Sequence, residues 1–261
     1  MSTRLISRIA AYDILIARCF LFIIGCIAVW WGIVSFLGQQ SLVERIANRV
    51  IAGESFNRAT LAQQLPIIES IERAAWCQPA ALRSAAIIQL RMIDVAGSTN
   101  DHKPTDADLK SLGSVIQNSL SCSPADPFLW LVLYWVENMQ NGFKPEHLKY
   151  LELSFQLGPN EGWVALKRSP VVFADYERLS SGLKENAFNE FLGLINHRFY
   201  EQAADIFTGP AWRVRDTLLP HLVSLPLQNR ETFARALYKR GFAVPIPGVE
   251  PPDSDPQWWR R

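Results

Sequence analysis

Cysteine and histidine are the side chains in this sequence that could bind a metal or activate a nucleophile, and the chain has four of each. The histidines form no H-x-x-x-H pair, and none lies near a cysteine in the sequence. A metal needs converging ligands and a nucleophile needs a neighbouring base. The glycines are scattered, and the phosphate-binding pattern G-x-x-x-x-G-K is missing. We therefore predict no metal site, no cofactor and no catalytic residue.

Acidic pairs and tryptophans are the next candidates. Asp106 and Asp108, like Asp253 and Asp255, lie in loop-like or proline-rich stretches, where solvent keeps carboxylates ionised. A glycosidase can bring two distant carboxylates together, so a glycan-active enzyme stays open as an alternative. All but two of the nine tryptophans lie outside the apolar N-terminal segment. They predict core packing, with a carbohydrate-stacking groove as the sharper alternative.

Two cysteines suggest a covalent link. Cys77 and Cys122 each stand two residues before a proline, Pro79 and Pro124. If these prolines mark equivalent positions on stacked helices, the cysteines lie close together, and an oxidising compartment favours a disulfide. Closing that loop would contribute roughly 4 kcal/mol on the chain-entropy model. Two buried free thiols are the alternative.

The longest uncharged stretch runs from residue 19 to residue 43, and its apolar part is residues 19–38, CFLFIIGCIAVWWGIVSFLG. A helix of this length spans about 30 Å, the thickness of the hydrocarbon core of a bilayer. We therefore predict a transmembrane helix over residues 19–40. A buried core helix is usually shorter and contains polar residues, and a cleaved signal peptide has a shorter apolar region that ends in small residues.

The flanking charges predict the orientation of this helix. Arg4, Arg8 and Arg18 precede it, whereas the charges that follow it nearly balance. Positive charge stays in the cytoplasm, so residues 1–18 would be a cytoplasmic segment and the rest would be exported. In a bacterium this describes a single-pass inner-membrane protein with a periplasmic domain.

Small residues recur on one side of the predicted membrane helix, at Gly25, Ala28, Gly32 and Ser35. Small residues let two membrane helices approach closely. They predict pairing with a second copy or with an inner-membrane protein complex, and chance is the alternative.

The exported part, residues 41–241, reads as an all-α domain. Apolar residues recur there at three- and four-residue spacing, and runs alternating with period two are scarce. Gly97, Gly142 and Gly241 follow apolar periodic segments, as glycines that end helices do. Thr60 with Gln63 has the spacing of a capping box and predicts a helix start.

A faint repetition runs through this domain. Pro79, Pro124 and Pro159 follow helical stretches at spacings of 45 and 35 residues. Residues 148–157 have the apolar spacing of a helix and would form the second helix of the repeat unit that begins at Pro124. In the segment NHRFYEQAADIF, Tyr200, Ala203 and Ala204 stand where a repeat unit has its turn and the start of its second helix. This pattern resembles a divergent array of tetratricopeptide repeats, which have a period of about 34 residues. The resemblance implies an α-solenoid, and an unrelated helical bundle is the alternative.

The C-terminal residues 242–261 differ from the domain in composition. They are rich in proline, which predicts an extended or disordered tail. The tail ends in an aromatic and basic tip that could bind a partner, formed by Trp258, Trp259, Arg260 and Arg261. The alternative is a tail that folds back over an end of the array.

The formal net charge is +1, so no strong field attracts nucleic acid. We expect a membrane-anchored, non-catalytic scaffold of the bacterial cell envelope that works through protein–protein interaction. Its layout is similar to that of accessory proteins of bacterial envelope polysaccharide systems, which implies a role in exopolysaccharide polymerisation or export and a glycan among its partners. A chaperone-like assembly factor for exported proteins is the second expectation.

Overall fold

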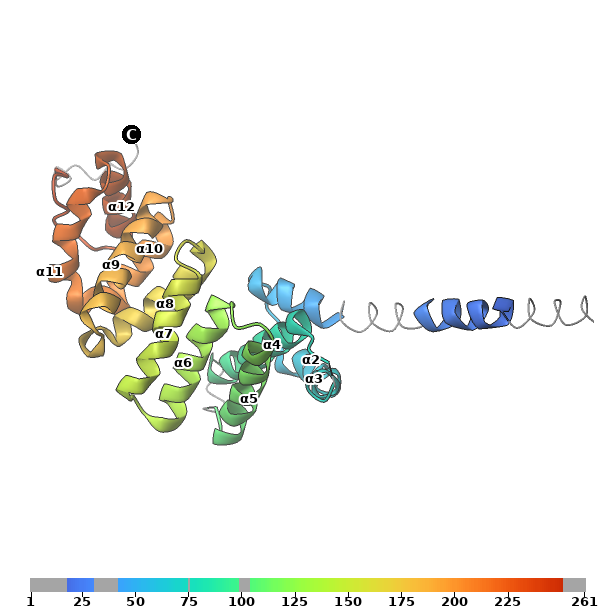
Figure 1. Cartoon of the computed structure of the whole chain (residues 1–261). Coiled ribbons are helices and arrows are strands. Elements are labelled where there is room, and N and C mark those ends of the chain that lie inside the picture. The colour runs from blue at the N-terminus through green and yellow to red at the C-terminus, as the bar shows by residue number, and fades with distance from the viewer. Residues whose placement is uncertain (1–17, 31–41, 75, 99–103, 251–261) are drawn as a thin grey trace, which may run out of the picture. The chain divides into compact units, whose positions relative to one another are not determined.

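A computed structural model describes residues 18–30, 42–74, 76–98 and 104–250 (Figure 1). Within these ranges every regular element is a helix and no strand occurs, which confirms the all-α prediction. The chain divides into two compact units, residues 1–108 and 109–261, and we describe each unit by itself.

The first unit contains helical residues 18–30 and 42–51 and three further helices. Those three are α2 (Arg58–Ala62), α3 (Leu65–Glu72) and α4 (Pro79–Ser98). The predicted N-cap at Thr60 is wrong by three residues, because Asn57 is the N-cap and its Oδ1 accepts a hydrogen bond from Thr60 N at 2.7 Å. An asparagine at this position satisfies a backbone N–H that has no partner inside the helix.

The core of the first unit lies where α2 and α3 pack against α4. Leu61 from α2 and Ile68 from α3 are fully buried, as are Ala81, Ala85 and Ile88 from α4. The α4 residues are spaced by four and three positions, so they lie on one face of the helix. The alanines let the shorter helices approach closely, and the isoleucine fills the remaining space.

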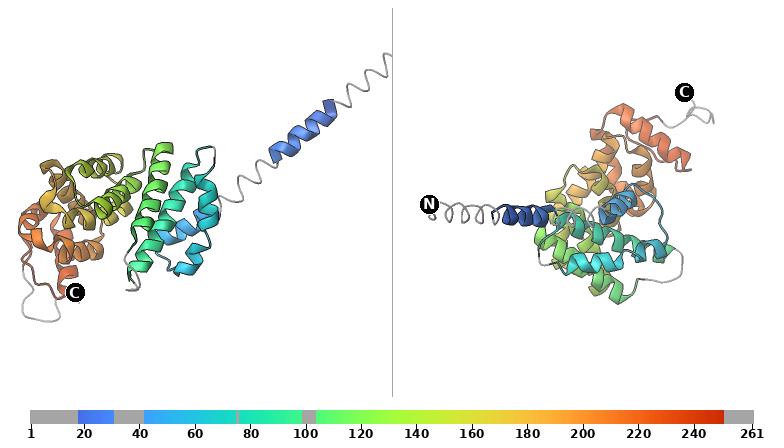
Figure 2. Two further views of the ribbon diagram at one scale, coloured as in Figure 1. Left: turned by 90° about the horizontal axis from the view of Figure 1, so that it is seen from below. Right: turned by 90° about the vertical axis from the view of Figure 1, so that its right-hand side faces the viewer.

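The second unit consists of helices joined by short turns (Figures 1 and 2). Its α-helices are α5 (Asp106–Cys122, which begins at the end of the first unit), α6 (Pro127–Asn141), α7 (Leu148–Leu157), α8 (Gly162–Ala174), α9 (Ser181–Asn196), α10 (Tyr200–Thr208), α11 (Arg215–Leu218) and α12 (Leu227–Lys239). Its 3-10 turns are η1 (Pro145–His147), η2 (Tyr176–Arg178), η3 (Pro210–Val214) and η4 (Leu219–Ser224).

Helices of the second unit pack most closely as α6 with α7, α8 with α9, and α10 with α12. The predicted helix over residues 148–157 is confirmed with the same bounds. The predicted helix end at Gly97 is wrong, because α4 continues through it to Ser98. The predicted ends at Gly142 and Gly241 are confirmed, since both glycines have positive φ angles, 69° and 82°. Such angles suit glycine, which has no side chain to clash with the backbone.

An aromatic cluster holds the second unit together. Phe191 and Phe233 meet edge to face with ring centroids 5.9 Å apart, and Phe207 packs against both. The chain returns to this core after α12, because Ile246 is buried in the same cluster. Residues 242–250 therefore fold back on the unit, as one sequence interpretation of the tail expected.

Candidate functional site

Several of the predicted site residues lie outside the described part of the chain. These are Gly32 and Ser35 of the small-residue stripe and the tip formed by Trp258, Trp259, Arg260 and Arg261. Gly25 and Ala28 lie on the helix of residues 18–30 and are exposed. A Cβ added at Gly25 would meet nothing within 4 Å, so this part of the stripe is open in the single chain.

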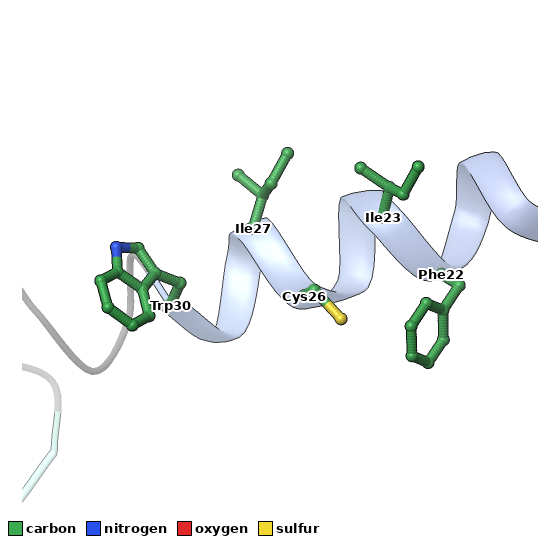
Figure 3. Close-up of a pocket in the computed structure, with 5 residues that line it drawn as sticks. All are labelled: Phe22, Ile23, Cys26, Ile27 and Trp30. Atoms are coloured by element: carbon green, nitrogen blue, oxygen red, sulfur yellow. The ribbon is translucent and has the colours of Figure 1, made fainter.

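The helix of residues 18–30 is apolar and exposed along its whole described length. Phe20 is 64% exposed, Phe22 74% and Trp30 72%. Phe22, Ile23, Cys26, Ile27 and Trp30 line a hollow of about 380 Å³, and all five come from this one helix (Figure 3). Without a second wall, the hollow is no enclosed ligand site.

The predicted span 19–40 is described only as far as residue 30. Within the described ranges, no helix combines the length and the apolar character that crossing a bilayer requires.

The four cysteines are of two kinds, two in a disulfide and two free. Cys77 and Cys122 are disulfide-bonded, which confirms the predicted disulfide. Cys19 and Cys26 are free thiols exposed on the helix of residues 18–30. The chain thus presents thiols of two kinds that a thiol reagent can distinguish.

A larger hollow than that of residues 18–30 lies in the second unit and has a volume of about 790 Å³. Its walls come from the end of α7, the following turn, the start of α8 and one face of α9. We call it the amide groove, because four of its lining residues carry neutral amide side chains. These are Gln156, Asn160, Asn186 and Asn189.

The four amides of the groove are open to solvent and make no side-chain hydrogen bond to any described residue. Each amide offers two N–H donors and one carbonyl acceptor. Asn186, Asn189 and Gly193 are spaced by three and four positions, so they follow one another along a single face of α9. His197 continues this line just after the helix.

A buried ion pair forms the back of the amide groove. Arg168 from α8 is fully buried, and its guanidinium pairs with the carboxylate of Glu190 on α9. Arg168 Nη1 donates to Ser154 O at 2.6 Å, and Nη2 donates to Gly158 O at 3.0 Å. The same guanidinium lies 4.1 Å from the ring centroid of Phe155. One side chain therefore fastens the end of α7 to α8 and α9.

The groove depends on a close approach at the turn between α7 and α8. A Cβ on Gly158 would lie 2.6 Å from Cγ of Pro127, the first residue of α6. Only glycine fits at this distance. Ser154 Oγ donates to Pro127 O at 2.7 Å and closes the same junction.

A second polar cluster joins α6 to the turn before α7 and to the turn after α8, and it is structural. Tyr134 is fully buried, and its hydroxyl donates to Asp175 Oδ2 at 2.8 Å. Burial, and after it the hydrogen bond to Asp175, raise the pKa of the Tyr134 hydroxyl above its ordinary value. His147 Nδ1 lies 2.8 Å from Asn138 Oδ1 in the same region. A neutral, buried tyrosine that already has its partner orients helices and offers no open reactive group.

The chemistry of the amide groove is hydrogen bonding. Its two titratable lining residues are Glu190, which is held by Arg168 and Ser169, and the exposed His197. In the described ranges, no three side chains of His, Cys, Asp or Glu gather where they could hold a metal ion. His102 lies outside those ranges.

Of the groove residues, sequence reasoning singled out Pro159 as a repeat proline, but neither the amides nor Gly193. For Arg168 a signal existed, because Val164, Arg168 and Val172 share one face of α8 at four-residue spacing. An arginine in an apolar stripe needs a buried partner. The asparagines carried no signal, because exposed amides look alike wherever they lie on a helix.

Comparisons with known proteins give no relative for this chain. No protein-family model, no curated protein and no solved structure matches it. The argument for function therefore depends on the residues and their geometry.

Proposed function

We propose that this protein is a membrane-anchored, non-catalytic scaffold of the bacterial cell envelope. Its N-terminal apolar segment is the anchor, and its helical-repeat domain binds partners on the periplasmic side. The observation that carries this proposal is the helix of residues 18–30, on which every residue is exposed and nearly all are apolar.

Water is an unfavourable surrounding for such a helix. Exposed apolar surface costs about 25 cal/mol for each Å², and this helix exposes aromatic and aliphatic side chains together. A soluble protein rarely leaves a large contiguous apolar surface open. The sequence continues without a charge through Gly38, and that length suits the hydrocarbon core of a bilayer. Lipid is therefore the solvent that best suits the segment.

The disulfide supports export of the remaining chain. Bonds such as that of Cys77 and Cys122 persist in oxidising compartments and are rare in the bacterial cytoplasm. The flanking arginines before residue 19 point to the same orientation.

Successive helix pairs support the scaffold role. The pairs α6 with α7 and α8 with α9 follow one another, and each pair begins shortly after a proline, Pro124 and Pro159. We interpret them as divergent tetratricopeptide-like units of an α-solenoid, in which each pair buries its apolar face against its neighbours. The layout similarity to accessory proteins of envelope polysaccharide systems makes polysaccharide polymerisation or export the proposed setting.

Thiol labelling tests the anchor in the full-length protein. Cys19 and Cys26 should resist a charged maleimide in intact membranes and react once the membranes are dissolved in SDS. Cys77 and Cys122 should react only after reduction, which provides an internal control. Rapid labelling of Cys19 and Cys26 without detergent would contradict a membrane anchor.

Reporter fusions test the orientation. Alkaline phosphatase fused to the C-terminus should be active. A fluorescent protein that folds only in the cytoplasm should give no fluorescence when fused at the same place. The opposite pair of results would contradict export of the domain.

A further inference from the structure

Gly193 lies within α9 at a position where no described residue requires a glycine for packing. A Cβ built on Gly193 meets nothing within 4 Å. Glycine in a helix interior is less stable than alanine, because it loses more backbone entropy on folding. Alanine would fit here, so the helix itself does not need this glycine. What glycine does at this position is leave the floor of the amide groove bare.

The open amides stand beside this bare position. Asn186 and Asn189 precede Gly193 on the same face of α9, and Gln156 and Asn160 line the groove from α7 and the following turn. None of the four has a hydrogen-bond partner among the described residues. Exposed donors and acceptors that line a groove without pairing with one another remain available to a ligand.

We propose that the amide groove binds an extended, uncharged peptide segment of another protein, whose main chain passes over Gly193. A peptide main chain carries one donor and one acceptor per residue, and asparagine and glutamine side chains can satisfy both kinds. A missing Cβ allows close approach of a ligand to a helix backbone. This inference deepens the proposed scaffold function and rests on it, since it names the partner that the helical domain holds.

The dimensions of the groove suit a short extended segment. From Asn186 to His197 the helix face measures about 16 Å at 1.5 Å per residue. An extended chain rises about 3.3 Å per residue, so about five residues fit along it. Side chains of such a segment alternate in direction, which lets every second residue point out of the groove.

Charge and ring positions also favour a peptide. Glu190 is neutralised by Arg168, so the groove holds no unpaired carboxylate that would select a cationic ligand. Phe155 is buried with one face against the Arg168 guanidinium, and the ring edge of Phe199 lies beside Gly162. Stacking on sugar rings is thereby restricted, whereas the four amides stay open.

The test uses the full-length protein in detergent micelles and a phage-displayed library of random dodecapeptides as the probe. Enriched peptides are synthesised and titrated against the wild type and against Gly193→Leu, whose side chain fills the floor of the groove. We expect at least a tenfold loss of affinity. Gly182→Leu is the matched control, because Gly182 lies in the same helix, also has nothing within 4 Å of its Cβ, and does not line the groove.

A second set of changes tests the amides and the main chain. Asn189→Leu should weaken binding about tenfold, the equivalent of 1.4 kcal/mol, and Gln202→Leu on α10 should leave it unchanged. N-methylation of the central peptide bonds should abolish binding, because it removes the N–H donors. Thermal melting of each variant confirms that it is folded.

Three results would overturn the proposal. They are a failure of the library to yield peptides that prefer the wild type over Gly193→Leu, equal affinity of N-methylated peptides, and Gly193-dependent binding of chitohexaose or maltoheptaose in place of peptides. The last result would make the groove a glycan site. Failure of the scaffold's membrane anchor would be seen separately, in the labelling of Cys19 and Cys26.

Discussion

The helix of residues 18–30 and α6 are built from similar apolar residues, yet their surroundings differ. In α6, Phe128, Leu129 and the run 131–134 are buried, and Leu131 and Tyr134 belong to the core cluster of the second unit. In residues 18–30 every side chain is exposed. The amount of apolar surface is therefore not what separates a core helix from a candidate membrane anchor.

The polar groups of the two segments show the difference. α6 begins at a cap, where Asp126 Oδ1 accepts hydrogen bonds from Phe128 N and Leu129 N. Two of its aromatic residues also have polar partners, since Trp130 Nε1 donates to Pro124 O at 2.7 Å and the Tyr134 hydroxyl donates to Asp175. The side chains of residues 18–30 have few polar atoms that need a hydrogen-bond partner, and the backbone groups pair with one another inside the helix. Such a segment is suited to lipid, where no water is available.

The largest expected effect comes from placing charge in each helix. Val132→Arg puts an unpaired cation into the core and should unfold the second unit, at a cost of several kcal/mol, without releasing the protein from membranes. The double change Ile23→Arg and Ile27→Arg should release the protein from membranes and leave the second unit folded. Each arginine costs about 2.5–3.5 kcal/mol at the centre of a membrane helix. Circular dichroism melting and carbonate extraction measure the two outcomes. If both variants unfold the domain, the helix of residues 18–30 belongs to a protein core.

Removal of the buried arginine should come next. Arg168→Ala leaves Glu190 buried and unpaired and should lower the free energy of unfolding by about 3–5 kcal/mol, with membrane retention unchanged. Denaturant titration measures the loss. Lys167→Ala is the control, because Lys167 is exposed on the same helix. An equal loss in both variants would contradict the assigned role of Arg168.

Opening the disulfide should have a smaller effect. Replacing both Cys77 and Cys122 by serine should lower the free energy of unfolding by about 2–4 kcal/mol, since the unfolded chain regains the freedom of the closed loop. Retention in the membrane should not change. The oxidised wild type should also migrate differently from the reduced protein on a non-reducing gel, and identical migration would argue against the bond.

The smallest loss of stability is expected from removing the N-cap of α6. Asp126→Ala should cost about 1 kcal/mol, because two backbone N–H groups lose their acceptor. Glu152→Ala, at an exposed position of α7, should change the stability by less than about 0.5 kcal/mol. Thermal melting of both variants in the same buffer checks the difference.

The helical segments could be predicted because their signals are local. Residues 148–157 repeat their apolar positions with helical spacing, and Gly142 and Gly241 mark ends that depend on backbone geometry alone. The start of α2 was mistaken because Thr60 and Asn57 are both good caps, and local pattern does not rank them. Cys77 and Cys122 were found because cysteine spacing followed the repeated prolines.

The sequence by itself determined the all-helical class, the apolar N-terminal segment and the cysteines that are bonded. These follow from periodicity, charge and residue type, which act over a few neighbouring residues. Only the tertiary structure decided that Arg168 meets Glu190 and that four amides and a bare glycine line one groove. Those residues are separated in the chain, and packing of α7, α8 and α9 brings them together. No local preference encodes which exposed asparagine will face a groove, because that depends on where the neighbouring helices lie.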